Sequence, residues 1–253
     1  MRSDALTFLD LFSRQASDYA AARPSYPDAL YECIVGLVPR RTLVWDCGTG
    51  NGQAARDLAR WFDRVIATDA SAAQIANAVA APKVTYRVAP AHGSGLAEHS
   101  VDAVAVAQAL HWFATDEFFA EVRRVTVPGG VIAAWSYGSC HAGEDVEATL
   151  RELEDGTLRG YWRPERKWVD EGYQTIPFPF PALPAPTFEL RVRWSLRQLG
   201  EYLNTWSAVD AYRRKHSENP VAPTLDRLAT CWGDPAATRD VTWPLALRIG
   251  RVG

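Results

Sequence analysis

The sequence lacks a long apolar run, clustered cysteines and an excess of charge of either sign, and each absence excludes a class of protein. No segment approaches the about 20 consecutive apolar residues of a membrane-spanning helix, and the first residues lack the apolar stretch of a signal peptide. The cysteines show neither CxxC nor Cys/His spacing, which argues against a zinc site and a disulfide framework. They are Cys33, Cys47, Cys140 and Cys231. We therefore expect a protein of the reducing cytoplasm with no metal and no membrane partner.

Positive and negative side chains are almost balanced, with 27 lysines and arginines against 30 aspartates and glutamates. Nucleic-acid binding needs a basic surface that neutralises phosphates, so we expect no nucleic-acid partner. With 253 residues and 47% hydrophobic content, the chain can bury about three quarters of its unfolded surface as one globular unit. No pattern in the sequence sets an oligomeric state.

Short β-type runs alternate with helical patterns between residues 42 and 135. Strands are expected at residues 43–46, 64–68, 84–88, 101–106 and 131–135, and helices at 53–62, 71–80 and 116–125. Pro128, Gly129 and Gly130 predict a turn before the last of these strands. Such alternation, with right-handed crossovers, predicts a doubly wound α/β fold with a mostly parallel sheet.

The flanking segments predict further helices at residues 6–12, 28–37, 144–158 and 196–214, and strands at 188–194 and 241–249. Pro244 is expected to break the last strand early, and the proline-rich segment 176–186 is expected to be a loop. The sheet then has seven strands. We expect an N-terminal helical cover (1–41), an α/β core (42–138) and a helical lid (139–253) that also supplies the last sheet strands (188–194 and 241–250).

Glycines occupy alternate positions where the first predicted strand runs into a helix, in the pattern Asp46-x-Gly48-x-Gly50-x-Gly52. They allow a sharp turn with positive φ and the close approach of a ligand. The third glycine comes one position earlier than in the Gly-x-Gly-x-x-Gly pattern that binds a pyrophosphate. Asp46 would repel a pyrophosphate and attract an ammonium, directly or through water. The stretch therefore favours a cofactor with an amino-acid moiety.

Asp69 ends the second predicted strand, about 20 residues beyond the glycines, where a carboxylate can accept the hydroxyls of a ribose. The tips of adjacent parallel strands lie at one end of a sheet, so we expect Asp69 and the glycine loop to share a site. Asp69 can also cap the helix that follows, and the two roles are not exclusive. The glycines can likewise be simple turn residues.

Further short motifs follow the later strands. They are Ala91-His92, Gln108-Ala109-Leu110-His111-Trp112-Phe113 and Pro128-Gly129-Gly130. Together with the glycine loop and Asp69, these motifs resemble those of the class I S-adenosylmethionine-dependent methyltransferases, whose fold is Rossmann-like. Residues 19–26 with Arg23-Pro24, and the later Thr205-Trp206-Ser207, are similar to the subgroup that includes trans-aconitate methyltransferase-like proteins.

The resemblance implies S-adenosyl-L-methionine as cofactor and requires no metal. The loop from Gly48 to Gly52 would pass its methionine portion, and Asp69 would hold its ribose. Ala70 would lie beside the adenine, and Ala91 with His92 would line the amino edge of that base. At His92 an acidic residue is common in relatives, which is the main departure from the family pattern.

The same resemblance gives Gln108 a backbone contact to the amino group of the cofactor. Arg23 would pair with the cofactor's carboxylate, which suits a planar guanidinium. Arg23 can instead only anchor the N-terminal segment. Tyr19, Asp46 and Thr49 belong to the same predicted cofactor-binding set.

His111 and Trp112 are the candidates for catalysis, because they follow the fourth strand, where substrate would meet the methyl donor. His111 is a general base, a substrate ligand or a buried structural histidine. Trp112 and Phe113 either wall the pocket or pack in the core. The lid contributes a mixture of cationic and aromatic residues that suits an anionic or amphipathic substrate, although a solvated helix face has a similar composition. These are Trp162, Arg163, Arg166, Lys167, Trp168, Tyr173 and Trp206.

The resemblance thus implies in-line methyl transfer to a small-molecule acceptor. If the acceptor is a carboxylate, as in the named relatives, it is ionised near neutral pH and needs no strong base. Two alternatives remain open on the sequence alone. One is a nicotinamide-dependent oxidoreductase, which the glycine spacing and Asp46 disfavour, and the other is a module that binds S-adenosylmethionine without transferring its methyl group.

Overall fold

Five parallel strands form the centre of the sheet. The structure, a computed structural model, describes residues 23–253, so the expected helix at 6–12 and Tyr19 lie outside the described residues. The parallel strands are β1 (Leu43–Cys47), β2 (Arg64–Asp69), β3 (Val84–Val88), β4 (Val101–Ala107) and β5 (Thr126–Ser136). The described chain adds β6 (Ala182–Leu183), β7 (Phe188–Trp194) and β8 (Arg239–Arg251).

The strand order is β3-β2-β1-β4-β5-β8-β6, with β8 antiparallel to β5. The doubly wound, mostly parallel sheet is therefore confirmed, and it has eight strands rather than seven because the short β6 joins its edge. The chain runs outward from β1 to β2 and β3 and then returns to pair β4 with the other edge of β1. At such a switch point the loops after two neighbouring strands diverge and leave a crevice at their carboxyl ends.

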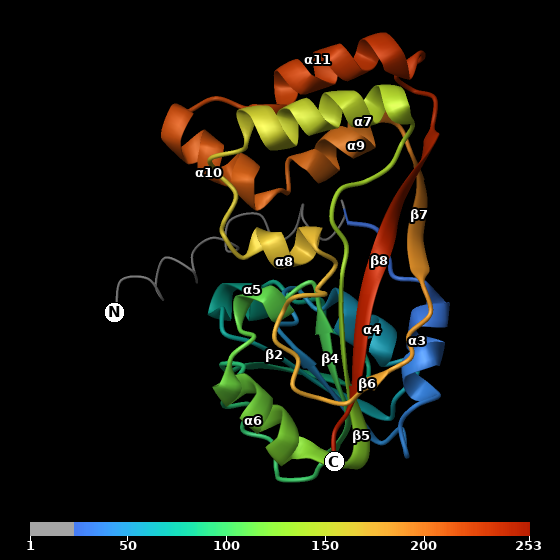
Figure 1. The fold of residues 1–253 in the computed structure, drawn as a ribbon, viewed down its shortest axis with the longest axis vertical. Helices are drawn as coiled ribbons and strands as arrows, with labels where there is room; N and C mark the ends of the chain where they lie inside the picture. The colour runs from blue at the N-terminus through green and yellow to red at the C-terminus, as the bar shows by residue number, and fades with distance from the viewer. Residues whose placement is uncertain (1–22) are drawn as a thin grey trace.

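Helices cover both faces of the sheet (Figure 1). On one face, α3 (Asp28–Val35) and α4 (Gln53–Leu58) pack in the same apolar cluster as Val44 of β1. On the other face, α6 (Asp116–Val125) packs in the cluster that contains Trp45. All five residues of β1 are buried, as expected for a central parallel strand covered on both sides. The short α5 (Ala72–Ala76) follows β2 and begins at Ser71, whose hydroxyl accepts from the backbone of Gln74.

The helices after β5 gather beyond the carboxyl ends of the parallel strands (Figure 1). They are α7 (Glu144–Arg151), continued by a π-helical segment (Glu152–Thr157), α8 (Arg166–Asp170), α9 (Leu196–Leu203), α10 (Ser207–His216) and α11 (Val221–Trp232). β7 pairs with the first half of β8, and the second half of β8 pairs with β5. Because β8 belongs to both parts, it fixes the helical layer relative to the end of the sheet.

The expectation that Pro244 breaks the last strand was wrong. β8 runs from Arg239 to Arg251, and Pro244 pairs with Glu189 of β7 within it. The N–H of Thr242 points to the opposite edge, toward the carbonyl of His141, and in a strand the residue two positions on points the same way. At that edge the chain after Ser136 has left the ladder, so the missing N–H of Pro244 costs no hydrogen bond.

The expected helix at residues 196–214 is two helices, because the chain turns between α9 and α10. The side chain of Asn204 donates to the carbonyl of Gly200, and the hydroxyl of Thr205 donates to the carbonyl of Tyr202. These side chains occupy carbonyls at the end of α9, and Trp206 adopts an extended backbone before α10 begins. The turn directs residues 205–207 toward the crevice, where they line a pocket described below.

Other boundaries also differ from expectation. β5 begins at Thr126, and Pro128, Gly129 and Gly130 form a bulge within it rather than a turn before it, since the register with β4 shifts there. A Cβ on Gly130 would lie 2.8 Å from the carbonyl oxygen of Asp102, so the bulge needs glycine at that position. Segment 176–186 contains β6, which pairs at the sheet edge where proline neighbours are tolerated. The helices at 53–62 and 71–80 are shorter than expected, and α8 and α11 were not expected.

Candidate active site

The glycine loop joins β1 to α4 and needs its glycines for two different reasons. Gly48, Gly50 and Gly52 all have positive φ, of 71°, 57° and 87°. A Cβ on Gly48 would also lie 2.7 Å from the Cβ of Ala109, and a Cβ on Gly52 would lie 2.6 Å from a ring carbon of Tyr86. Gly50 faces open space, since the nearest atom to its Cβ position is 3.8 Å away. Gly48 and Gly52 are therefore required by packing as well as by backbone conformation, whereas Gly50 is required by conformation alone.

Asp69 lies at the tip of β2 and holds the loop directly. Its Oδ2 accepts from the N–H of Gly50 at 2.9 Å, and its Oδ1 accepts from the N–H of Ser71 at 2.8 Å. Burial raises the pKa of Asp69, and the two backbone donors oppose this rise. Each carboxylate oxygen has a further lone pair, so Asp69 can orient the loop and still accept from a ligand hydroxyl.

Asp46 lies beneath the loop. It is fully buried, and its Oδ2 accepts from the hydroxyl of Thr49 at 2.5 Å. Its Oδ1 has no hydrogen-bond partner among the described residues. Burial raises the pKa of Asp46 to about 7. Because Thr49 and not Asp46 faces the pocket above, any charge on Asp46 acts on a ligand through the loop.

A cavity, which we call the loop pocket, opens between this loop and the chain after β4. Of the predicted cofactor residues it brings together Arg23, Gly48, Thr49, Gly50, Asp69, Ala70, Ala91 and Gln108, and Trp112 joins them. Gly52, Asp46 and His92 do not line it, and Tyr19 lies outside the described residues. Phe113, for which the sequence left open a place in the pocket wall or in the core, lines it too. Further lining residues, to which the sequence gave no role, are Tyr26, Cys47, Asn51, Gln53, Ala54, Ser71, Gln74, Ala89, Ala107, Ala109 and Tyr137.

His92 is exposed, while its neighbour Ala91 lines the loop pocket. The N–H of Gly93 donates to the carbonyl of Pro90 at 3.1 Å, so Ala91 and His92 are the central residues of a turn. The turn directs the two side chains differently, and it leaves His92 outside the lining of the loop pocket.

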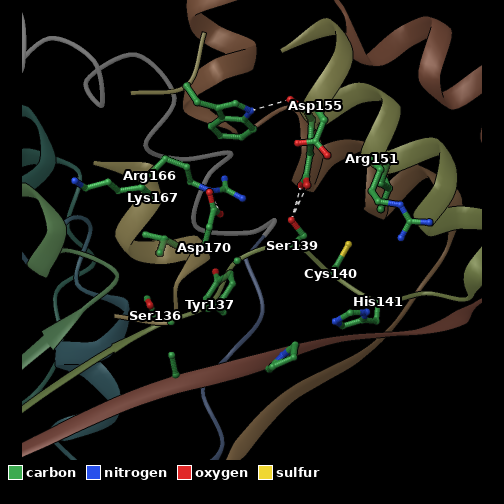
Figure 2. Close-up of a pocket in the computed structure, with 18 of the residues that line it drawn as sticks. Ser136, Tyr137, Ser139, Cys140, His141, Arg151, Asp155, Arg166, Lys167 and Asp170 are labelled. Atoms are coloured by element: carbon green, nitrogen blue, oxygen red, sulfur yellow. Dashed lines mark hydrogen bonds and ion pairs between the residues drawn. The ribbon is translucent and has the colours of Figure 1, made fainter. Parts of the chain in front are cut away.

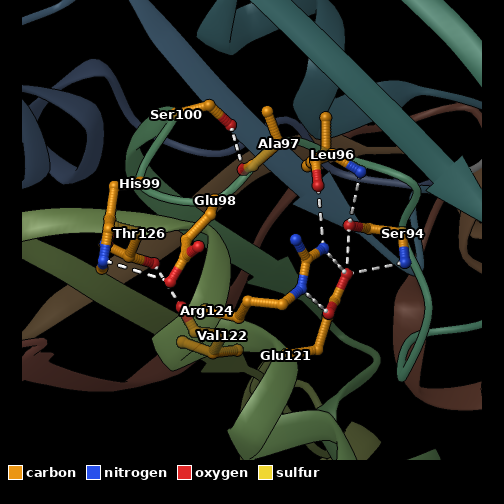
Figure 3. Close-up of polar contacts among 10 residues, drawn as sticks. All are labelled: Ser94, Leu96, Ala97, Glu98, His99, Ser100, Glu121, Val122, Arg124 and Thr126. Atoms are coloured by element: carbon orange, nitrogen blue, oxygen red, sulfur yellow. Dashed lines mark hydrogen bonds and ion pairs between the residues drawn. The ribbon is translucent and has the colours of Figure 1, made fainter.

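The long connection between β3 and β4, which carries Ala91, is tied to α6 (Figure 3). Glu121 of α6 accepts from the N–H of Ser94 at 2.9 Å and from Nε of Arg124 at 2.7 Å. Arg124 also donates to the carbonyl of Leu96 at 2.8 Å. Arg124 lowers the pKa of Glu121 to about 2, so the network stays charged at neutral pH. It fixes one wall of the loop pocket from the far side of the connection.

Gln108 directly follows β4 and has a positive φ of 52°, which is uncommon for a residue other than glycine. Its N–H donates to the carbonyl of Trp135 at 2.8 Å, and its side-chain amide donates to the carbonyl of Tyr137 at 2.9 Å. These two bonds hold the strained backbone at the rim of the loop pocket. Such strain is found where a chain must present its peptide groups in a particular direction.

Arg23 lies between the loop pocket and a second cavity. Its Nη1 donates to the hydroxyl of Tyr137 at 3.1 Å, and its guanidinium lies 5.6 Å from the ring centre of Tyr202. The second cavity, which we call the aromatic pocket, shares Arg23, Gln108, Trp112 and Tyr137 with the loop pocket. It is otherwise lined by His111, Gly138, Trp162, Arg163, Arg166, Val169, Tyr202, Thr205, Trp206 and Ser207.

The charged side chains of the aromatic pocket are all cationic. Arg23, Arg163 and Arg166 line it, and no aspartate or glutamate among the described residues does. Arg166 lies 4.2 Å above the ring of Trp162, and Arg163 lies 6.0 Å from the ring of Trp112. Nε of Arg166 donates to Oδ1 of Asp170 at 2.6 Å, and a guanidinium on an aromatic face has further donors on its terminal nitrogens that suit a planar anion.

His111 lies in a short 3-10 turn (Leu110–Trp112) directly after β4. It is buried, its Nδ1 is 2.8 Å from the hydroxyl of Tyr173, and its ring centre is 4.6 Å from that of Trp112. Burial, followed by the charge of Arg166, lowers the pKa of His111 to about 3. The imidazole is therefore neutral at physiological pH and too weak a base to be an effective general base there.

A larger cleft, of about 880 Å³, lies beside the aromatic pocket (Figure 2). We call it the outer cleft. The chain after β5 forms one wall, with Ser139, Cys140 and His141, and the segment that carries Arg166 and Lys167 forms another. Charges of both signs line it, so it has no single preference for an ion. It adjoins the aromatic pocket, since Trp162, Arg163 and Arg166 line both cavities.

Within residues 23–253, no group of three or more potential metal ligands clusters, and no helix is long and apolar enough to cross a membrane. Two features define the Rossmann-like α/β class. One antiparallel strand lies beside five parallel strands, and a glycine loop after β1 lies against the acidic residue at the tip of β2. Comparison with known proteins then specifies the family. A family profile described as "Methyltransferase domain" matches residues 45–134.

Two whole-chain similarities extend this match. A Dictyostelium discoideum protein assigned as a methyltransferase is 34% identical over 252 residues, which cover 96% of this chain and 95% of that protein. The solved structure of a protein from Anaeromyxobacter dehalogenans, assigned as a type II methyltransferase, is 46% identical with a TM-score of 0.84, covering 91% of this chain and 98% of that one. A Schizosaccharomyces pombe methyltransferase is 27% identical, covering 79% of each chain.

The chain belongs to the class I S-adenosylmethionine-dependent methyltransferases and is a methyltransferase. The comparisons favour neither a nicotinamide-dependent oxidoreductase nor a non-catalytic module. They do not show the trans-aconitate specificity of the subgroup named above.

Proposed function

We propose that the protein transfers the methyl group of S-adenosyl-L-methionine to the carboxylate of a small molecule. In this proposal the core (42–138) holds the cofactor in the loop pocket, and the lid (139–253) holds the acceptor in the aromatic pocket. The observation that carries the proposal is the charge of the aromatic pocket. It adjoins the loop pocket, and among the described residues its charged lining consists of Arg23, Arg163 and Arg166, the last of which also donates to Asp170 at 2.6 Å from outside the lining.

The loop pocket fits the cofactor by the chemistry of its donors. The lone pairs of Asp69 suit the ribose hydroxyls, and the bare backbone at Gly50 leaves room for the chain that leaves the sugar. Arg23 can pair with the cofactor's carboxylate from the junction of the two pockets. When bound, the cofactor would supply a methyl group on a positively charged sulfur, and the acceptor oxygen would bond to the methyl carbon as the carbon–sulfur bond breaks and the neutral thioether leaves.

The residues of the aromatic pocket then orient the acceptor and exclude water. Arg163 and Arg166 are placed to bind an anionic acceptor, and Trp112, which lines both pockets, would pack beside the point where the acceptor meets the cofactor. A carboxylate is ionised at neutral pH and gives up no proton in the transfer. This agrees with the low pKa of His111, which would serve poorly for an acceptor that must be deprotonated.

The test is methyl transfer from tritiated S-adenosylmethionine to a panel of mono-, di- and tricarboxylates, with neutral alcohols and amines of similar size as controls. We expect label only in carboxylate products, and we expect mild alkali to release it as methanol, because methyl esters hydrolyse and methyl ethers and amines do not. Label that is stable to alkali, in an alcohol or amine product, would refute the carboxylate assignment. Extracts of small molecules, followed by mass identification of the labelled product, extend the panel.

A further inference from the structure

The nearest polar partner of His111 comes from far along the chain. Tyr173 follows α8 and is separated from His111 by 62 residues, yet its hydroxyl lies 2.8 Å from Nδ1 of the imidazole. Tyr173 is fully buried, and its ring centre is 5.9 Å from that of His111. A buried hydroxyl in this position must either donate to Nδ1 or accept from it, and the choice sets the proton on the other ring nitrogen.

The surroundings of the Tyr173 oxygen decide between the two. Burial raises the pKa of Tyr173, and hydrogen bonds from the backbone of His111, the side chain of Ser136 and the backbone of Leu110 oppose the rise, so the oxygen already accepts. The Tyr173 hydroxyl has hydrogen-bonding geometry with Nδ1 of His111, whereas Oγ of Ser136, a second nearby oxygen, has no hydrogen-bond partner of that geometry among the described residues. If Nδ1 carried a proton, a buried O–H would have no acceptor, at a cost of about 1–3 kcal/mol.

The backbone of Tyr173 shows that its position is specifically maintained. Its φ is +60°, which is costly for an aromatic residue. Nη1 of Arg248, on β8, donates to the carbonyls of Tyr173 and Ile176, each at 2.9 Å. A strained residue held by an arginine on another element indicates that the placement of its side chain matters.

We propose that Tyr173 is a positioning residue that holds His111 as the Nε2–H tautomer. Since Nδ1 is engaged, Nε2 is the nitrogen that remains for a ligand in the aromatic pocket, which His111 lines. His111 then acts as a hydrogen-bond donor to an oxygen of the acceptor and not as a base. This role rests on the proposed methyl transfer, whereas the tautomer rests on the hydrogen bonds around Tyr173 and needs no acceptor.

The test is the ¹⁵N spectrum of the five histidines at neutral pH, in protein labelled with ¹⁵N-histidine. The variant His111→Gln identifies the signals of His111 by their loss. We expect an unprotonated Nδ1 and a protonated Nε2 in His111. A protonated Nδ1, in either the neutral or the cationic ring, overturns the proposal. This spectrum needs no acceptor, so it decides the tautomer even if the carboxylate assignment fails.

The variant Tyr173→Phe removes only the hydroxyl and should shift the Nδ1 signal of His111. The matched control is Tyr161→Phe, which removes the hydroxyl from another tyrosine–histidine pair, with His216 in the lid, and should leave His111 unchanged. Tyr173→Phe should also reduce methyl transfer about fivefold, on the scale of one hydrogen bond, with unchanged affinity for S-adenosylhomocysteine. An unchanged Nδ1 signal in folded Tyr173→Phe overturns the role of Tyr173. If the variant does not fold, the wild-type spectrum still decides.

Discussion

The N–H of Gly50 donates to Oδ2 of Asp69 at 2.9 Å, so the bend after β1 and the tip of β2 form one hydrogen-bonded unit. Gly48 and Thr49 strengthen it, since both donate through their N–H groups to the carbonyl of Thr68 at 2.9 Å. The loop is thus positioned by its neighbouring strand before any ligand is considered. Changes at Asp69 should therefore affect the ligand and the loop together.

The first prediction concerns Asp69. Asp69→Ala should weaken the affinity for S-adenosylhomocysteine by about 10 to 100 fold, because it removes charge-assisted hydrogen bonds to a ribose and to the loop. Titration calorimetry measures this directly. Asp63→Ala is the control, because Asp63 is an exposed acid that directly precedes β2, at the end away from Asp69. Equal affinity in wild type and Asp69→Ala would contradict the proposed contact.

The second prediction separates the two requirements for glycine. Gly52→Ala should destabilise the protein more than Gly50→Ala, because its Cβ would collide with the ring of Tyr86. The shared cost of positive φ is about 1–3 kcal/mol. Gly160→Ala is the control, since a Cβ there meets no atom within 4 Å and no positive φ is needed. Chemical denaturation gives the free energy of unfolding of each variant relative to the wild type. Equal decreases for Gly50→Ala and Gly52→Ala would show that the ring of Tyr86 moves aside and that the collision does not occur.

The third prediction concerns the arginines of the aromatic pocket. Arg163→Met and Arg166→Met should each raise the KM for a carboxylate acceptor about tenfold, the scale of one charge-assisted hydrogen bond, without changing cofactor affinity. Arg159→Met is the control, because Arg159 is exposed and lies outside the lining of the aromatic pocket. Steady-state kinetics at saturating cofactor measures the effect. A loss of cofactor affinity in either variant would place that arginine in the loop pocket instead.

The fourth prediction follows from the raised pKa of Asp46. Its folded pKa of about 7 lies above the usual value of 3.8, so between these values the folded state binds a proton that the unfolded state does not. The free energy of unfolding should therefore fall as the pH rises from about 4 to about 7, because the folded state loses the proton on Asp46. The fall is up to about 1.4 kcal/mol per unit of difference between the folded and unfolded pKa values. Asp46→Asn should flatten this part of the profile of unfolding free energy against pH. If both proteins show the same slope, Asp46 is already ionised in the fold.

Local pattern was sufficient for the centre of the fold. The strands at 84–88 and 188–194 and the helix at 116–125 have the predicted bounds, because their apolar residues repeat with the period of the element. The glycine loop was also recognisable from the sequence, because glycine is the residue type that adopts positive φ most readily and it occupies three alternate positions there. Pro244 shows where this reasoning ends. Whether a proline ends a strand depends on which edge of the ladder its nitrogen faces, and pairing with distant residues decides that.

Residue types along the chain by themselves determined the Rossmann-like sheet, the bare loop and the acid beside it, because these depend on neighbours a few residues apart. Only the tertiary structure placed Asp46 beneath the loop, turned His92 outward and brought Tyr173 to His111. It also joined arginines of the lid to the chain after β4 in one pocket. The burial, charge and protonation of a side chain depend on residues that are distant along the chain and are brought into contact by packing. The local periodicity of the sequence does not specify these contacts.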